Sequence, residues 1–162
     1  MTDAIDKYDR ALHYVHQSCT ITTGEQCDHK KYVKSMSSYQ GTYMKYLIVV
    51  ENEVKICDSQ QTCIYEILKS INLECLDYLV HKLCTSRESI IEKNRNLFLA
   101  KNADYGNSFE DFGFLGIMVR LNDKINRMKS LAVKNTNEVS SESFMDTVQD
   151  LYNYTLLGLM YV

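Results

Sequence analysis

The chain has 162 residues, of which 45% are hydrophobic and 24% charged, and its formal net charge is −3. This length suits one compact domain rather than two full ones. The balanced charge excludes a globally disordered chain and a binder of nucleic acid or membranes that relies on net charge alone. The chain has 0 Pro and only 6 Gly, which disfavours a β-sandwich or barrel and favours a mostly α protein with long helices.

The first half of the chain alternates helical patterns with one β-like stretch. Apolar residues at helical spacing predict a helix over residues 4–15, and a short second helix is expected over 28–41. The runs Ile48-Val49-Val50 and Val54-Lys55-Ile56 indicate a small β-hairpin over 43–57, with a helix as the alternative. Residues 58–83 follow as one kinked helix or two short ones.

The second half reads as three further helices. Thr85, followed three residues later by Glu88, is a capping-box pattern that predicts a helix ending near Asn102. Apolar stripes predict the next two helices over 113–132 and 140–161, joined by a polar tract. The fold class expected is therefore a mostly α helical bundle.

Soft metal ligands are confined to the first half, because every Cys and His lies within residues 1–84. This asymmetry suggests an N-terminal extension over 1–85 and a second module over 86–162, within one compact domain. A Zn²⁺ site is one reading of the N-terminal cluster, but no CxxC pair supports it. The cluster comprises His13, His16, Cys19, Cys27 and His29.

The remaining cysteines, Cys57, Cys63, Cys75 and Cys84, fall on or near apolar faces, where free Cys behaves as a small buried hydrophobe. A nucleophilic pair of Cys84 with His81 has no supporting motif. The first ten residues are acidic and amphipathic rather than basic and then apolar, unlike a secretory signal. No apolar run approaches the roughly 20 residues of a membrane helix, so a cytoplasmic protein with reduced thiols is expected.

Acidic side chains share one face of the last predicted helix. Glu142, Asp146, Asp150 and Asn153 are spaced at four, four and three residues. A solvated acidic face is the ordinary reading. However, like charges at i, i+4 repel and lower helix stability, which a bound cation would relieve.

A mixed stripe of Arg120, Asp123, Lys124 and Arg127 follows the preceding helix. It could form a salt-bridge seam with the acidic face. Alternatively, the carboxylates could hold Mg²⁺ while the bases neutralise phosphate groups, as phosphoryl chemistry requires. The spacing of these residues is compatible with both interpretations.

The loop Lys101-Asn102-x-Asp104-Tyr105-Gly106-x-Ser108 gathers several polar side chain types around one glycine. A helix C-cap followed by a turn explains Asn102 and Gly106 but leaves Lys101, Asp104 and Tyr105 unexplained.

Three ordered motifs resemble those of the nucleotide modification associated domain 1 family, whose members are often encoded by phages. They are the loop above, then Arg120-Leu121-x-Asp123-Lys124-Ile125-x-Arg127, then Glu142-Ser143-x-x-Asp146-Thr147-x-x-Asp150-Leu151-x-Asn153-Tyr154. The resemblance covers about residues 86–160. The family in turn resembles the all-α nucleoside triphosphate pyrophosphohydrolases of the MazG and dimeric dUTPase type.

The resemblance implies a helical bundle that binds a deoxynucleotide beside Mg²⁺. In the pyrophosphohydrolases a metal-bound water attacks the α-phosphorus, giving the monophosphate and pyrophosphate. The resemblance assigns catalysis to Asp123, Asp146 and Asp150, which with Glu142 would also bind the metal. The substrate-binding residues it implies are Lys101, Asp104, Tyr105, Arg120, Lys124, Arg127 and Asn153.

This chain departs from the pyrophosphohydrolases at one motif. They carry a Glu-rich ExxE motif on the facing helix, where this chain has only Asp123 among bases. Glu88 and Glu92, one turn apart, are candidates for the missing metal ligands. The function expected is thus a Mg²⁺-dependent dNTP pyrophosphohydrolase or related nucleotide-processing protein, forming a homo-oligomer. The alternative is a non-enzymatic structural or interaction subunit that keeps the bundle.

Overall fold

The chain forms a helical bundle with one short β-hairpin, as a computed structural model shows for residues 2–16, 29–50, 53–56, 61–106, 111, 113–134 and 140–161. Most of these residues are helical, which confirms the predicted fold class. The elements are α1 (Thr2–His16), α2 (His29–Met44), β1 (Leu47–Val50), β2 (Glu53–Ile56), α3 (Gln61–Leu83), α4 (Arg87–Tyr105), α5 (Gly113–Lys134) and α6 (Ser140–Leu159).

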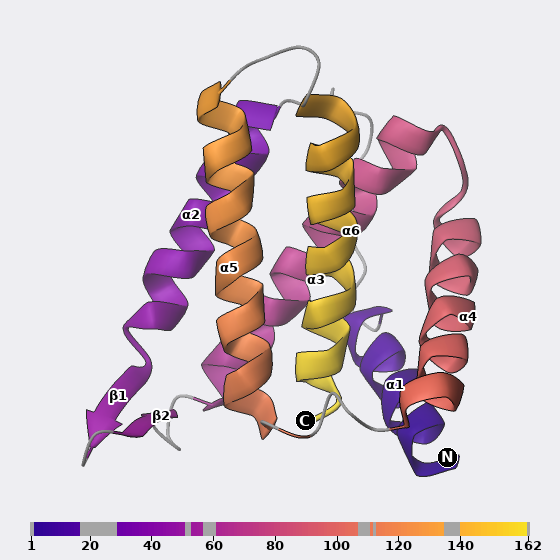
Figure 1. Cartoon of the computed structure of the whole chain (residues 1–162), viewed down its shortest axis with the longest axis horizontal. Coiled ribbons are helices and arrows are strands. Elements are labelled where there is room, and N and C mark those ends of the chain that lie inside the picture. Colours follow the sequence, from indigo (N-terminus) through magenta and orange to yellow (C-terminus); the bar gives the residue numbers. More distant parts are fainter. Residues whose placement is uncertain are drawn as a thin grey trace.

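The helices pack against one another as a bundle. Helices α5 and α6 run side by side, and α3 crosses behind them (Figure 1). Helix α2 lies along α5, whereas α1 and α4 flank the opposite side of the bundle (Figure 1). Strands β1 and β2 pair antiparallel in the register Leu47 to Ile56. This arrangement leaves α4 packed on α3 while it stands beside α6.

Helices α3 and α6 form the centre of the hydrophobic core because both bury more than one narrow stripe. In α3 the side chains of Leu68, Ile71, Cys75 and Leu79 are fully buried. Asn72 is also buried, and its Nδ2 donates to Tyr152 O at 3.0 Å and Thr155 Oγ1 at 2.9 Å on α6. A buried amide with these partners specifies how α3 and α6 align.

The polar contact between α2 and α5 is built around Gln40, which is 9% exposed. Its Nε2 donates to Asn122 Oδ1 at 2.7 Å and to Asn126 Oδ1 at 2.9 Å. Lys129 Nζ donates to Gln40 Oε1, and Tyr43 Oη donates to Asn122 Oδ1. Satisfied buried polar groups of this kind fix the register of two helices more sharply than apolar packing does.

Several predicted boundaries shift in the structure. Helix α2 continues past Gly41 to Met44, and residues 61–83 form one continuous helix. The N-cap of α4 is Ser86 rather than Thr85, because Ser86 Oγ accepts from Ser89 N at 3.1 Å. Helix α4 also runs one turn beyond Asn102, and the predicted hairpin is confirmed.

The predicted division near residue 85 falls in the connection between α3 and α4, where Cys84 has a positive φ of 49°. The hydrophobic core crosses this division, since buried residues of α1, α2 and α3 join those of α5 and α6 in one cluster.

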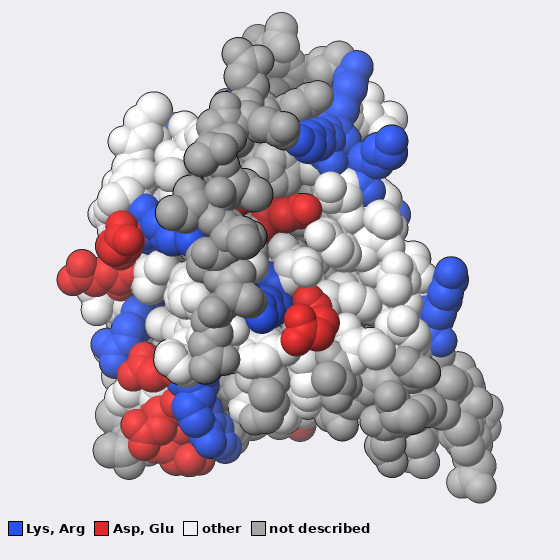
Figure 2. Space-filling model, turned by 180° about the vertical axis from the view of Figure 1, so that it is seen from behind, with Lys and Arg blue, Asp and Glu red and all other residues white. Residues whose placement is uncertain are grey.

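Charges are interspersed on the surface. On the side of Figure 2 formed by α1 and α4, basic and acidic groups alternate, and Arg95 Nε lies 2.9 Å from Asp9 Oδ1 there. None of the described helices is long and apolar enough to cross a membrane.

Candidate functional site

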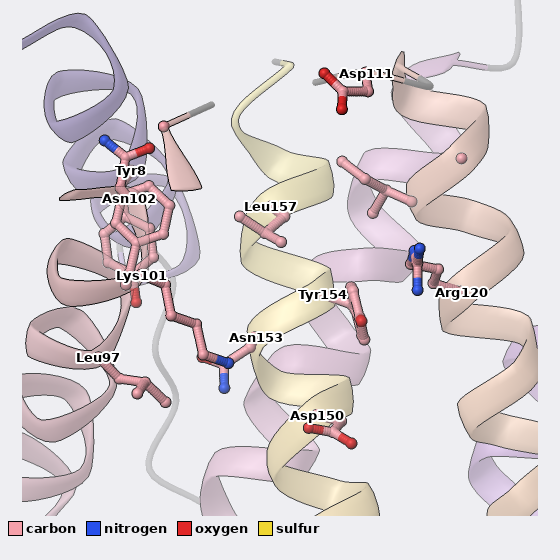
Figure 3. A pocket seen from close by; sticks show the side chains of 14 residues that line it. Tyr8, Leu97, Lys101, Asn102, Asp111, Arg120, Asp150, Asn153, Tyr154 and Leu157 are labelled. Carbon is pink, nitrogen blue, oxygen red and sulfur yellow. The ribbon is translucent and has the colours of Figure 1, made fainter. Parts of the chain in front are cut away.

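A cavity of about 440 Å³ opens between α4 and α5, with α6 as its floor and α1 closing one side (Figure 3). Its size falls within the range of small-molecule sites, roughly 300–1,000 Å³. Helices α4 and α5 approach α6 from opposite sides, so side chains from three helices face one space. The lining residues are Tyr8, Leu97, Phe98, Lys101, Asn102, Gly106, Asp111, Gly116, Ile117, Arg120, Asp150, Asn153, Tyr154 and Leu157.

One wall of the cavity is aromatic and apolar. The rings of Tyr8 on α1 and Phe98 on α4 stack with centroids 4.4 Å apart and an interplanar angle of 12°. Leu97 on α4 is 41% exposed beside them. Because Tyr8 is only 2% exposed, this stacked pair is part of the packed wall, and Leu97 is the apolar side chain on α4 that is open to a ligand.

Two cationic side chains line the cavity from opposite helices. Lys101 comes from the last turns of α4, whereas Arg120 comes from the middle of α5 (Figure 3). Both residues are exposed to solvent. The separation of like charges across one cavity suits an anion that lies between them.

Two carboxylates line the same cavity, Asp111 near the start of α5 and Asp150 on α6. Of these two, Asp150 forms an ion pair. Its Oδ2 lies 2.9 Å from Lys124 Nζ on α5, and the two side chains are 46% and 28% exposed. Lys124 does not line the cavity itself but holds the carboxylate that does. This ion pair is one contact of the salt-bridge seam, which is one of the two interpretations of the sequence. Arg120 is not part of the pair and lines the cavity.

Amides position the floor and the α4 wall. Asn153 Nδ2 on α6 donates to Asn94 Oδ1 at 3.2 Å, and Asn94 Nδ2 donates to Ile90 O within α4. Asn94 is buried, so this link fixes α4 against α6 at the base of the cavity. At the end of α4, Asn102 O accepts from Gly106 N at 2.8 Å, and Gly106 takes a positive φ of 63° that favours glycine.

Two buried polar atoms in the cavity lining have no hydrogen-bond partner among the described residues. They are Tyr8 Oη and Asn102 Oδ1, whose residues are only 2% and 6% exposed. Burial raises the pKa of Tyr8 well above its ordinary value, so the phenol stays protonated. Buried polar groups are nearly always hydrogen-bonded in folded proteins, which makes these two atoms the most unusual feature of the cavity.

The structure brings four of the predicted site residues to the cavity, namely Lys101, Arg120, Asp150 and Asn153, with Lys124 behind Asp150. Six others are exposed and do not line it: Glu88, Glu92, Asp104, Asp123, Asp146 and Arg127. The side chains of Tyr105 and Glu142 lie outside the described part of the structure.

The described residues do not form a preassembled metal centre. Within them, no three Asp, Glu, His or Cys side chains come together in a group that could hold an ion. Among the described side chains of α6, Asp150 alone contributes a carboxylate to the cavity, and Asp111 contributes a second one from near the start of α5. The Zn²⁺ alternative falls largely outside the described residues, which do not include residues 17–28 or the side chain of His29.

The cysteines agree with the sequence interpretation in part. Cys75 is fully buried, as expected of a small apolar residue, and burial raises the pKa of its thiol. Cys63 and Cys84 are exposed instead, because they lie near the two ends of α3 rather than in its buried middle. The Cys84 Sγ contact is with His81 O at 3.6 Å. Cys57 lies outside the described residues.

Sequence reasoning missed the aromatic and amide wall of the cavity. Tyr8 was placed in the apolar stripe of the first helix, and nothing in that stripe distinguishes a core tyrosine from one that reaches a cavity. Asn102 was assigned to a helix C-cap. The sequence signal for Asn102 is its place inside the motif that starts at Lys101. In the structure α4 continues past Asn102, so the side chain of Asn102 does not cap the helix.

These features define a mostly α bundle with a cavity lined by two bases, two carboxylates and a group of aromatic, apolar and amide side chains. A family model described as nucleotide modification associated domain 1 matches residues 101–162. The matched segment holds Lys101, Asn102, Arg120, Asp150 and Asn153, but begins later than the expected residue 86. Comparisons with curated proteins and with solved structures found no match.

Proposed function

We propose that the cavity binds a nucleotide, with its phosphates between Lys101 and Arg120, and that the protein is a Mg²⁺-dependent dNTP pyrophosphohydrolase. The observation that carries the proposal is this pair of cations on opposite helices, in a cavity that also presents aromatic, apolar and amide side chains and the carboxylates of Asp111 and Asp150. A nucleotide combines a polyanionic end with a planar ring. The family description of the matched segment also supports nucleotide chemistry.

The two cations contribute differently to phosphate binding. The guanidinium of Arg120 can donate two parallel hydrogen bonds to one phosphate, whereas the ammonium of Lys101 acts as a point charge. Because they come from α5 and α4, a bound phosphate chain would bridge these helices. Binding should therefore also stabilise the folded protein.

The proposed Mg²⁺ would depend on the nucleotide as much as on the protein. Mg²⁺ is usually held by one or two carboxylates together with substrate phosphates rather than by an all-protein cage. Asp150 provides one such carboxylate at the cavity, and its contact with Lys124 orients it. When bound, the metal would polarise a phosphoryl oxygen and neutralise charge. Asp150 would hold it, and Arg120 and Lys101 would orient the phosphates.

A binding titration with matched ligands and variants tests the phosphate site. Calorimetry should show dNTP binding and much weaker binding of the corresponding nucleoside. Lys101→Met and Arg120→Met should each weaken dNTP binding by about tenfold or more, the expected loss of a charge-assisted hydrogen bond. Lys93→Met removes another exposed lysine of α4 that does not line the cavity, so it should leave binding unchanged. Equal binding of nucleoside and dNTP would contradict the proposal.

A turnover assay separates the enzyme from the non-enzymatic alternative. Incubation of each dNTP with Mg²⁺ should release pyrophosphate and the monophosphate in equal amounts. Binding without turnover on any dNTP would discard the hydrolase and leave a nucleotide-binding module. Mass measurement in solution checks the homo-oligomer that we also propose from the family resemblance.

A further inference from the structure

The β-hairpin lies at one corner of the molecule, outside the helical bundle. Strand β1 begins three residues after α2 ends at Met44, and the hairpin lies at the foot of α2, away from α1 and α4 (Figure 1). Strand β2 contacts α5, whereas β1 lies on the outer side of the hairpin (Figure 1). One edge of β1 pairs with β2, in a register that runs from Leu47 opposite Ile56 to Val50 opposite Glu53. The other edge of β1 therefore faces away from the bundle.

This outer edge of β1 has no pairing strand in the described part of the chain, whose sheet consists of β1 and β2. In an antiparallel strand, successive residues direct their N–H and C=O groups to opposite edges, so half of the β1 residues direct theirs to the open edge. Natural sheets protect such edges with charged residues, proline or a covering element, because an open edge is a template for another strand. The β1 sequence LIVV contains neither a charge nor a proline.

The sequences of the two strands are typical of different positions in a sheet. Strand β2, with the sequence EVKI, alternates charged and apolar residues, as edge strands with one solvated face do. Strand β1 is a continuous apolar run, which is typical of a strand covered on both faces inside a larger sheet. In a hairpin alone both strands are edge strands. The sequence of β1 therefore indicates a further strand on its open edge.

We propose that β1 pairs antiparallel with β1 of a second copy of this chain, joining the two hairpins into one four-stranded sheet in the order β2-β1-β1-β2. Each β1 then becomes an interior strand and each charged β2 an edge strand, in agreement with their sequences. A two-fold axis through the β1 pair sets the strand opposite itself. Like charges directly opposite each other destabilise a sheet, and β1 has none, so it is compatible with its own copy. The added strands also stabilise a hairpin that would be marginal alone.

Apolar surface continues from β1 onto the end of α2. Met44, the last residue of α2, is 49% exposed, so the surface available to a second copy is not limited to the strand. A pair of four-residue strands is a small interface, and the association should therefore be weak and depend on protein concentration. The inference does not depend on nucleotide binding, but it names the surface through which the proposed homo-oligomer would form.

Self-association of the unaltered protein tests the interface directly. Sedimentation velocity over a wide range of concentration should show a reversible dimer. Hydrogen exchange at the amides of residues 47–50 should slow as the dimer forms, because N–H groups at the open edge become hydrogen-bonded. A protein that is monomeric at every concentration would overturn the proposal. A dimer that forms without slowing exchange at residues 47–50 would do the same, since its interface would lie elsewhere.

Variants of opposite charge test whether β1 meets its own copy. Val49→Lys and Val49→Glu each place like charges near the two-fold axis, so each should weaken self-association by about tenfold or more. An equimolar mixture of the two variants should restore dimers with one copy of each, which native mass spectrometry detects. Val133→Lys is the matched control, because it adds the same charge at an 84% exposed valine in the last turn of α5, at the opposite end of the bundle from the hairpin (Figure 1). This control should dimerise like the wild type.

Circular dichroism and thermal melts establish that the Val49 variants fold. Folded variants that each dimerise as tightly as the wild type would refute the β1 pairing. A mixture that stays monomeric would also refute it, because opposite charges on two copies of β1 should attract. If neither variant folds, hydrogen exchange in the wild-type protein decides between the β1 edge and another interface.

Discussion

Replacement of Asp150 by Asn separates the structural and functional roles of one carboxylate. The structural role is the 2.9 Å contact with Lys124 Nζ, made by side chains that are 46% and 28% exposed. Ion pairs this accessible to solvent contribute about 0–1 kcal/mol. For a chain of this length 1 kcal/mol corresponds to a shift of roughly 2–4 °C in the melting midpoint. Asp150→Asn should therefore lower the midpoint by less than about 4 °C.

The effect of the same change on dNTP binding should depend on whether Mg²⁺ is present. Without metal, the carboxylate repels the phosphates that we place nearby, and its loss also frees Lys124. Asp150→Asn should then bind dNTP more tightly than the wild type in the presence of a chelator. With Mg²⁺, the variant lacks the carboxylate that holds the ion, so its advantage should disappear and pyrophosphate release should be abolished.

The assay is calorimetric titration of dNTP in chelator and in Mg²⁺, combined with pyrophosphate release. Asp77→Asn is the matched control, because it breaks an ion pair with Arg87 at 3.2 Å whose side chains are both 22% exposed and lie outside the cavity. This control should lose similar or greater stability while binding and turnover remain normal. Full pyrophosphate release by Asp150→Asn, or weakened binding in chelator, would refute the reasoning.

Two further predictions concern buried polar groups. Gln40→Leu should lower the free energy of unfolding by about 1–3 kcal/mol, because it leaves Asn126 and Lys129 without their partner on α2 and removes one of the two α2 donors to Asn122; an unchanged urea midpoint would show that this network does not stabilise the fold. Burial raises the pKa of Glu74, although Tyr39 Oη donates to its carboxylate at 3.1 Å and partly opposes the shift. The wild type should therefore gain stability as pH falls through that raised pKa toward the ordinary value of 4.5. Glu74→Gln should be more stable than the wild type at pH 8, and thermal melts should show this advantage vanishing below pH 4.5.

The fold was largely predictable because apolar periodicity reports burial directly. The stripes of α1, α5 and α6 correspond to buried faces, including Val15, Leu121 and Leu151. Helix ends were less predictable, since Gly41 lies inside α2 with open space around it and imposes no break. Which of two adjacent residues caps α4 depends on local hydrogen bonding, and Ser86 rather than Thr85 provides it.

The site was predictable only where motifs marked it. Lys101, Arg120 and Asp150 stand in motifs and reach the cavity, whereas Asp123 and Asp146 share those motifs and are exposed outside it. Helical spacing gives the direction of a side chain around its own axis but not which neighbouring helix it meets. The contribution of Tyr8 depends on where α1 docks, which no local pattern encodes.

The continuous core has a practical consequence for isolating the family-matched segment. Residues 101–162 contain α5 and α6, but the face of α6 that carries Tyr152 and Thr155 packs on α3, and α5 is tied to α2 through Gln40. An expression fragment cut at residue 101 would expose both faces to water and would lack the tyrosine of α1. The smallest piece of this chain worth purifying for ligand screening therefore begins at α1, well upstream of the matched boundary.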